Sequence, residues 1–144
     1  MKIYLGSDHA GFELKEKIKK FLTEGGYEIV DFGALAFDEK DDYPDFCRPV
    51  AEAVTKDSGG RGIILGGSGQ GEAMVANRIS GARAAVFYGG SDEIIKLSRE
   101  HNDANILSLG ARFLNDEDVF KAIKLWLDTP FSGDERHKRR IAKF

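Results

Sequence analysis

The segment Gly62–Leu65 (GIIL) most constrains the fold, because it contains no polar side chain and runs directly into GGSGQGE, residues 66–72. A strand that is apolar on both sides is typical of the interior of a parallel sheet with helices on both faces. The four glycines in six positions that follow it indicate a backbone that closely approaches a neighbouring segment or a ligand.

Strand-like and helix-like periods alternate along the rest of the chain. We expect strands at 2–5, 27–30, 62–65, 82–87 and 106–109, and helices near 12–22, from 42 onward, through 76, at 92–100 and at 116–127. A basic helical segment is expected at about 134–144. Strands and helices that alternate with short connections predict one α/β domain over residues 1–144. Its five-stranded parallel sheet would be covered by helices on both faces.

Composition excludes several classes of protein. The chain is 42% hydrophobic and 31% charged, with a net charge of −3, which gives no reason to expect a nucleic-acid or membrane partner. Cys47 is the only cysteine and suits a reducing compartment. The N-terminus, MKIYLGSDHAGF, does not resemble a signal peptide, and no apolar stretch approaches the roughly 20 residues of a membrane span. We therefore expect a cytoplasmic protein.

Ligands of such sheets bind beyond the carboxyl ends of the strands. In this sequence, that rule selects Asp8 and His9, the glycine loop at 66–72, and Arg112. The loop is not a Walker A motif, because Glu72-Ala73 stand where Lys-Ser/Thr would be needed. It is not a dinucleotide fingerprint either, because it follows the third strand and carries an acid at the last small position.

The loop could instead supply backbone N–H groups to an anion or to an oxyanion that forms during a reaction. Glu72 would then be a base beside an oxyanion hole, an arrangement suited to removing a proton next to a carbonyl. The alternative is that the glycines form a tight turn and that Glu72 complements the helix dipole.

Other polar residues also allow two interpretations. Asp8-His9 could be a helix cap and its neighbour, and His101-Asn102 could end a helix. Arg136 and Arg140 would share one helix face, either as a phosphate clamp or as part of a solvated basic tail. Packing is the expected role of Tyr43 and Cys47.

Taken together, these pieces resemble the ribose-5-phosphate isomerase B family, which also includes allose- and galactose-6-phosphate isomerases. The resemblance rests on SDHAGFELK (7–15), DYPDF (42–46), GGSGQGEAMVANRISGARAA (66–85), SREHNDANILSLGAR (98–112) and ERHKRRI (135–141). It implies a Rossmann-like three-layer sandwich without a metal or an organic cofactor. It also implies aldose–ketose isomerisation through an enediolate, in homodimers or tetramers with shared active sites.

One residue divides that family. Many members have a cysteine base directly before a GTG- or GSG-type sequence, at the position where this chain has Gly66. The other branch has GGSGNGE and uses the glutamate after the loop, so GGSGQGE assigns the base to Glu72.

The resemblance also implies roles for the remaining site residues. It places Asp8 on substrate hydroxyls, His9 near the phosphate, Ser68 beside the reacting oxygens, His101 in ring opening, and Asn102 beside the enediolate. The loop residues Gly67, Gly69, Gln70 and Gly71 would bind the substrate, and the phosphate clamp would comprise Arg112, Arg136 and Arg140.

Alternative functions differ in the residues that they require. A non-catalytic sugar-phosphate-binding protein would need the arginines and the loop but neither Glu72 nor His101. A nucleotide-binding module is disfavoured by the two failed motif tests. Within the isomerases, the sequence leaves open a tetrulose 4-phosphate, or allose or galactose 6-phosphate, as the substrate.

The position of His101 predicts that one chain does not complete the site. His101 precedes the fifth strand, so it should lie at the edge of the sheet opposite the glycine loop. A strand spans about 15–20 Å, farther than a side chain reaches. Either residues 101–104 fold back over the sheet, or a second subunit supplies His101, as the resemblance implies.

Overall fold

The computed structural model describes all residues from Met1 to Phe144. Five parallel strands form one sheet in the order β2-β1-β3-β5-β4. The strands are β1 (Lys2–Ser7), β2 (Glu28–Asp31), β3 (Arg61–Gly66), β4 (Ala84–Phe87) and β5 (Ile106–Gly110). The predicted sheet is therefore confirmed, with β1 two residues longer than expected and β4 beginning two residues later.

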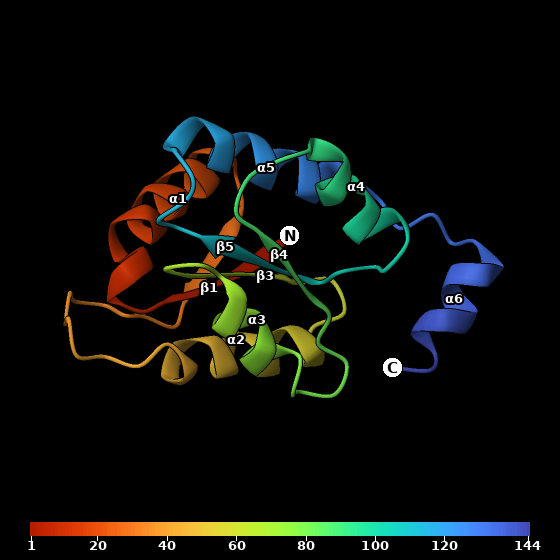
Figure 1. Ribbon diagram of the computed structural model, residues 1–144, viewed down its shortest axis with the longest axis horizontal. Coiled ribbons are helices and arrows are strands. Elements are labelled where there is room, and N and C mark those ends of the chain that lie inside the picture. The colour runs from red at the N-terminus through yellow and green to blue at the C-terminus, as the bar shows by residue number, and fades with distance from the viewer.

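Helices cover both faces of this sheet (Figure 1). On one face lie α1 (Phe12–Glu24), α4 (Asp92–Glu100) and α5 (Asp116–Asp128), and on the other lie α2 (Pro44–Lys56) and α3 (Gln70–Ala76). A short 3-10 helix, η1 (His9–Gly11), precedes α1, and α6 (Glu135–Ile141) extends away from the other helices. This is the predicted Rossmann-like three-layer arrangement. No helix combines the length and the apolar character that crossing a membrane requires.

Local sequence signals explain where several helices begin. Ser91 accepts a hydrogen bond from the N–H of Glu93 at the start of α4, and Asn115 accepts one from Asp118 at the start of α5. Both are favoured N-cap residues because their side-chain oxygens satisfy free N–H groups of the first turn. At the start of α2, Pro44 occupies a first-turn position, where its missing N–H costs nothing.

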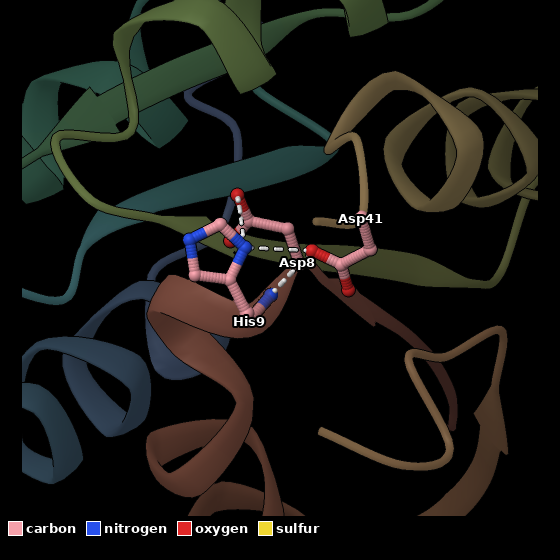
Figure 2. Close-up of side chains that lie close together, drawn as sticks. All are labelled: Asp8, His9 and Asp41. Carbon is pink, nitrogen blue, oxygen red and sulfur yellow. Dashed lines mark hydrogen bonds and ion pairs between the residues drawn. The ribbon is translucent and has the colours of Figure 1, made fainter. Parts of the chain in front are cut away.

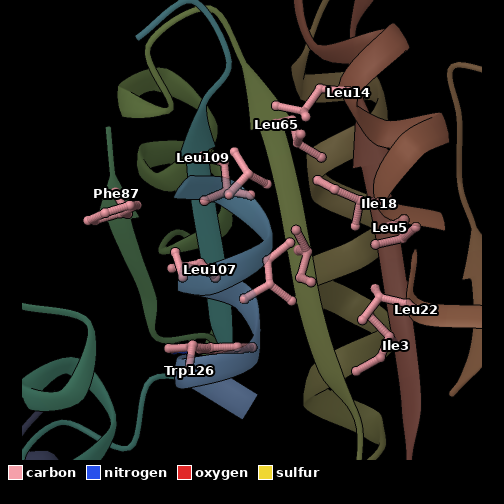
Figure 3. Packing of buried hydrophobic residues seen from close by; sticks show 14 of the residues in the cluster. Ile3, Leu5, Leu14, Ile18, Leu22, Leu65, Phe87, Leu107, Leu109 and Trp126 are labelled. Carbon is pink, nitrogen blue, oxygen red and sulfur yellow. The ribbon is translucent and has the colours of Figure 1, made fainter. Parts of the chain in front are cut away.

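Alternate residues of the central strands face two separate cores. Ile63 and Leu65 of β3 join the larger core beneath α1 and α5, whereas Ile64 joins the smaller core beneath α2. Figure 3 shows the larger core, in which Leu14, Ile18 and Leu22 of α1 lie over β1 and β3. The apolar GIIL segment is thus buried on both sides, as predicted.

We expect the larger core to be sensitive to truncation at Ile18, which is fully buried. Replacement of Ile18 with Ala should lower the free energy of unfolding by about 2–5 kcal/mol, because it removes buried methyl groups and leaves a cavity. Urea unfolding at a fixed protein concentration measures this change. The exposed Lys20→Ala on the same helix is the control, and equal losses in the two variants would contradict the packing described here.

Candidate active site

The register of the three central strands brings the predicted site residues together at one edge of the sheet. Ser7 of β1 pairs with Leu65 of β3, and Gly66 pairs with Gly110 of β5. The segments that follow these strands line a cavity of about 510 Å³. The lining residues are Asp8, His9, Ala10, Tyr43, Gly67, Ser68, Gly71, Glu72, Arg112 and Phe113.

The glycine loop is held in place through its carbonyl groups. The carbonyls of Gly66 and Gly67 accept hydrogen bonds from the N–H groups of Ala111 and Arg112, at 2.9 and 3.1 Å. The Gly69 carbonyl accepts from the hydroxyl of Ser108 at 2.6 Å. By contrast, the N–H groups of Gly67 and Ser68 donate to no acceptor within the chain. The loop therefore offers N–H donors beside the cavity, as an oxyanion hole requires.

Two positions in this loop need glycine for different reasons. Gly69 has a φ of 78°, in the left-handed region that other residues rarely adopt, and a Cβ there would lie 3.0 Å from the backbone of Leu109. At Gly66 the backbone is unstrained, but a Cβ would overlap the Glu72 carboxylate. The missing side chain at position 66 thus provides the space that the Glu72 side chain occupies.

Glu72 is a buried carboxylate at the base of the cavity, with 4% of its surface exposed. Burial raises its pKa above the usual value, and the nearby charge of Asp8 acts in the same direction. The N–H groups of Glu72 itself and of Gly69 act in the opposite direction. A carboxylate whose pKa is shifted toward neutrality is suited to accept and return a proton.

Asp8 caps a helix, as the sequence allowed, and also lines the cavity. Its carboxylate accepts a hydrogen bond from the N–H of Ala10 at 3.0 Å, so it caps η1, and it also lines the cavity. Burial raises the pKa of Asp8.

Ser68 lines the cavity as well, and its Oγ accepts a hydrogen bond from the N–H of Gln70 at 3.3 Å. Gly69 and Gln70 belong to the same loop but do not line the cavity.

Sequence reasoning missed Asp41, which contacts His9 from an irregular segment far along the chain. Asp41 Oδ1 lies 2.7 Å from His9 Nδ1 and accepts a hydrogen bond from the His9 backbone N–H at 2.9 Å (Figure 2). With Asp8, these side chains present ligand atoms within 4.8 Å of one another, the spacing of a metal site. However, Nδ1 of His9 already makes a hydrogen bond with Asp41, so these two side chains are arranged as a hydrogen-bonded pair.

The two residues expected only to pack have different surroundings. Cys47 is fully buried in the smaller core, and burial raises the pKa of its thiol. Packing is thus confirmed for Cys47, which does not line the cavity. Tyr43 packs against the same core but also lines the cavity, so packing alone was an incomplete prediction.

The structure does not bring His101, Asn102, Arg136 and Arg140 to this cavity. His101 follows α4, and its ring stacks on that of His137 in α6, with ring centroids 4.2 Å apart. Asn102 lines a different cavity, of about 410 Å³, beside β4. The 101–104 segment leads into Ile106, which pairs with Gly62 at the opposite end of β3 from the glycine loop. It therefore does not fold back over the sheet.

A network of arginines fixes this segment. Asp103 has a φ of 45°, and its carboxylate pairs with Arg83 and Arg99, each at 2.8 Å. Arg99 also donates to the carbonyl of Ala104 at 2.7 Å. These contacts hold the turn that follows His101 and Asn102, at the end of the sheet opposite the glycine loop.

Comparisons with known proteins show which family the chain resembles. The model of the ribose/galactose isomerase family matches residues 3–144.

The chain belongs to the ribose/galactose isomerase family.

The expected enzyme class and the resemblance noted in the sequence are thereby confirmed. Ribose-5-phosphate isomerase B of Mycobacterium tuberculosis is 43% identical over 98% of this chain and 86% of its own length. The structure of the corresponding enzyme from Clostridium thermocellum has a TM-score of 0.93 and 45% identity, over 99% of this chain and 94% of the other. The Mycoplasma genitalium enzyme, solved with bound ribulose-5-phosphate, has a TM-score of 0.93 and 40% identity, over 99% and 92% of the two chains.

The space that Gly66 leaves for the Glu72 carboxylate can be tested by adding a side chain at position 66. In the isomerase, Gly66→Ala should leave the fold intact but displace the carboxylate, so turnover should fall by about 100-fold or more, as for loss of a general base. Turnover assays and circular dichroism measure the two effects.

Gly59→Ala is the matched control, because the nearest atom to its new Cβ, Asp57 Oδ1, lies at an ordinary distance of 3.7 Å. Normal turnover in Gly66→Ala would show that the position of the Glu72 carboxylate does not matter for the reaction.

Proposed function

We propose that the isomerase interconverts ribose 5-phosphate and ribulose 5-phosphate through an enediolate, with Glu72 as the base. The chemistry rests on one observation above all, which is that the buried Glu72 carboxylate fills the space left by Gly66 beside the free N–H groups of the glycine loop. The choice of substrate is supported by the relatives described above, which are named for ribose 5-phosphate.

The proton transfers need no external oxidant or reductant. Glu72 removes the proton from C2 of the open-chain aldose, and the electron pair moves to the carbonyl oxygen at C1. The N–H groups of Gly67 and Ser68 stabilise the resulting oxyanion. A proton then passes from the C2 hydroxyl to the C1 oxygen, a step that the Ser68 hydroxyl assists. Protonated Glu72 returns its proton to C1, which gives the ketose and restores the carboxylate.

The phosphate end of the substrate is bound by cationic groups. Arg112 and His9 of the same chain line the cavity, and Asp8 accepts hydrogen bonds from substrate hydroxyls. A guanidinium can bind a phosphate through two parallel hydrogen bonds, so Arg112 suits this role.

A second copy of the chain supplies the remaining groups. His101 opens the furanose ring, Asn102 contacts the enediolate, and Arg136 and Arg140 complete the phosphate clamp. Both arginines are exposed on α6, which extends away from the other helices (Figure 1). Large exposed apolar side chains, which a second copy would cover, include Met74, Tyr88, Phe113 and Phe144.

The proposed reaction is tested with a panel of four-, five- and six-carbon phosphosugars, assayed with the unaltered chain and with Glu72→Gln. We expect the highest kcat/KM with ribose 5-phosphate. Glu72→Gln should lose about 100-fold or more in kcat with little change in KM, because the amide keeps the shape but cannot accept the proton. A better four- or six-carbon substrate would overturn the substrate assignment, and normal turnover in Glu72→Gln would overturn the base.

The pH dependence and a cysteine control sharpen that experiment. Because the pKa of Glu72 is raised, its base form is complete above the raised value, and kcat/KM should fall as the pH drops through it. Residual turnover of Glu72→Gln should lack this acidic limb. Cys47→Ala should keep near-normal turnover, because the thiol lies in the core and outside the cavity.

Shared sites predict complementation between two inactive variants. Glu72→Gln chains mixed with His101→Ala chains under subunit exchange should form heterodimers with one intact site, because Glu72 comes from one chain and His101 from the other. Activity should return to up to about half the normal value per heterodimer. Exchange is verified with two different affinity tags, and each variant exchanged with itself is the control. Confirmed exchange without activity would place both residues of one site on the same chain.

A further inference from the structure

Asp41 has a largely buried carboxylate with one protein partner. Its side chain is 10% exposed, and both of its contacts, to the backbone N–H and to the ring of His9, use Oδ1. The other oxygen, Oδ2, is buried without a hydrogen-bond partner. A buried carboxylate is costly unless a cation compensates its charge, and the group placed to do so is the His9 imidazolium.

The contact also fixes the direction of the His9 ring. Asp41 engages Nδ1, and Figure 2 shows Nε2 on the far side of the ring, directed away from Asp41. The backbone hydrogen bond to the same oxygen holds the start of η1 against Asp41, and the contact at Nδ1 restricts rotation of the ring. The ring of Phe37 packs edge-on against His9, with ring centroids 6.3 Å apart.

We propose that Asp41 is a positioning residue that directs Nε2 of a protonated His9 toward the phosphate group of the substrate. The inference rests on the function proposed above, in which His9 lies at the phosphate end. A neutral ring that donates Nδ1–H to Asp41 would have only an acceptor at Nε2, which would repel a phosphate oxygen. A protonated ring donates from both nitrogens, so Asp41 converts His9 into a charged donor for an anion.

The charges around His9 support this assignment. Asp41 raises the pKa of His9 through its hydrogen bond, and the charges of Asp8 and Asp41 add to the shift. Partial burial and the charge of Arg112 act against it. The other titratable groups that line the same cavity are Tyr43 and Glu72. His9 therefore contributes to phosphate binding below its raised pKa, and this contribution is lost as the pH rises through that value.

The experiment compares Asp41→Asn with the unaltered enzyme and with Asp45→Asn, which removes an exposed carboxylate from the first turn of α2. The chain has three histidines, so NMR can follow the ring of His9, assigned with a His9→Asn variant. Asp41→Asn should lower the pKa of His9. It should also raise KM for ribose 5-phosphate by about tenfold with little change in kcat, as for loss of a charge-assisted hydrogen bond.

The pH profile separates positioning from a merely structural role. Measurements between about pH 7 and 9 keep the phosphate doubly ionised, since its second pKa is near 6. In Asp41→Asn, KM should begin to rise at a lower pH than in the unaltered enzyme. An unchanged His9 titration together with an unchanged KM profile would overturn the proposal.

A second arm needs no variant and no catalysis. Inorganic phosphate added to the unaltered enzyme should raise the pKa of His9 further, because a bound anion stabilises the imidazolium. No change at saturating phosphate would overturn the role of His9 in anion binding. If the unaltered enzyme isomerises no ribose 5-phosphate while Asp41→Asn still lowers the pKa of His9, the proposed substrate fails and the positioning by Asp41 stands.

Discussion

The pairing of β3 between β1 and β5 is the constraint on which the rest of the site depends. In this register, the backbone after β3 lies directly beside the backbones that follow the other two strands. Side chains would keep such segments apart, and glycines at the junction allow the contact. The hydrogen bonds from Ala111 and Arg112 then use the loop carbonyls, so that free N–H groups remain beside the cavity. The apolar core on both sides of β3 holds this geometry rigid without any contact to a substrate.

Glu72 departs from the ordinary rules of burial. A carboxylate that is almost fully buried destabilises a fold unless it is paired, and no cation pairs with Glu72. Its energetic cost appears as the raised pKa, which is also what makes a carboxylate a better base at neutral pH. The same sheet tolerates it because Gly66 provides the space and because loop N–H groups offset part of the cost. Such a conflict with local stability is expected at a functional site.

The sequence predicted the strands, the helices and the edge of the sheet that holds Glu72, because these follow from local periodicity and from one topological rule. It could not reveal Asp41, since nothing in the sequence links that position to His9. Their contact depends on the path of an irregular segment, and no periodic pattern describes such a path. The sequence also did not reveal that a side chain at position 66 would overlap the Glu72 carboxylate. This relation appears only when the end of β3 and the first turn of α3 are placed to within about an ångström. The helical spacing of Arg136 and Arg140 allowed a phosphate clamp, but only the resemblance gave a role to His101, and these residues lie outside the cavity of their own chain.

The residues that lie outside that cavity nevertheless form one structural unit. His101 and Asn102 are fixed by the network around Asp103, and α6 docks on the same place through the stacking of His137 on His101. Burial and the neighbouring His101, Arg136 and Arg140 lower the pKa of His137, which favours its neutral form. In the shared site proposed above, a second copy would therefore deliver His101, Arg136 and Arg140 together, as one preorganised surface. Preorganisation reduces the entropy lost when the site assembles. In a parallel sheet, the two ends of the strands lie a strand length apart. A site that combines residues from both ends therefore needs two chains.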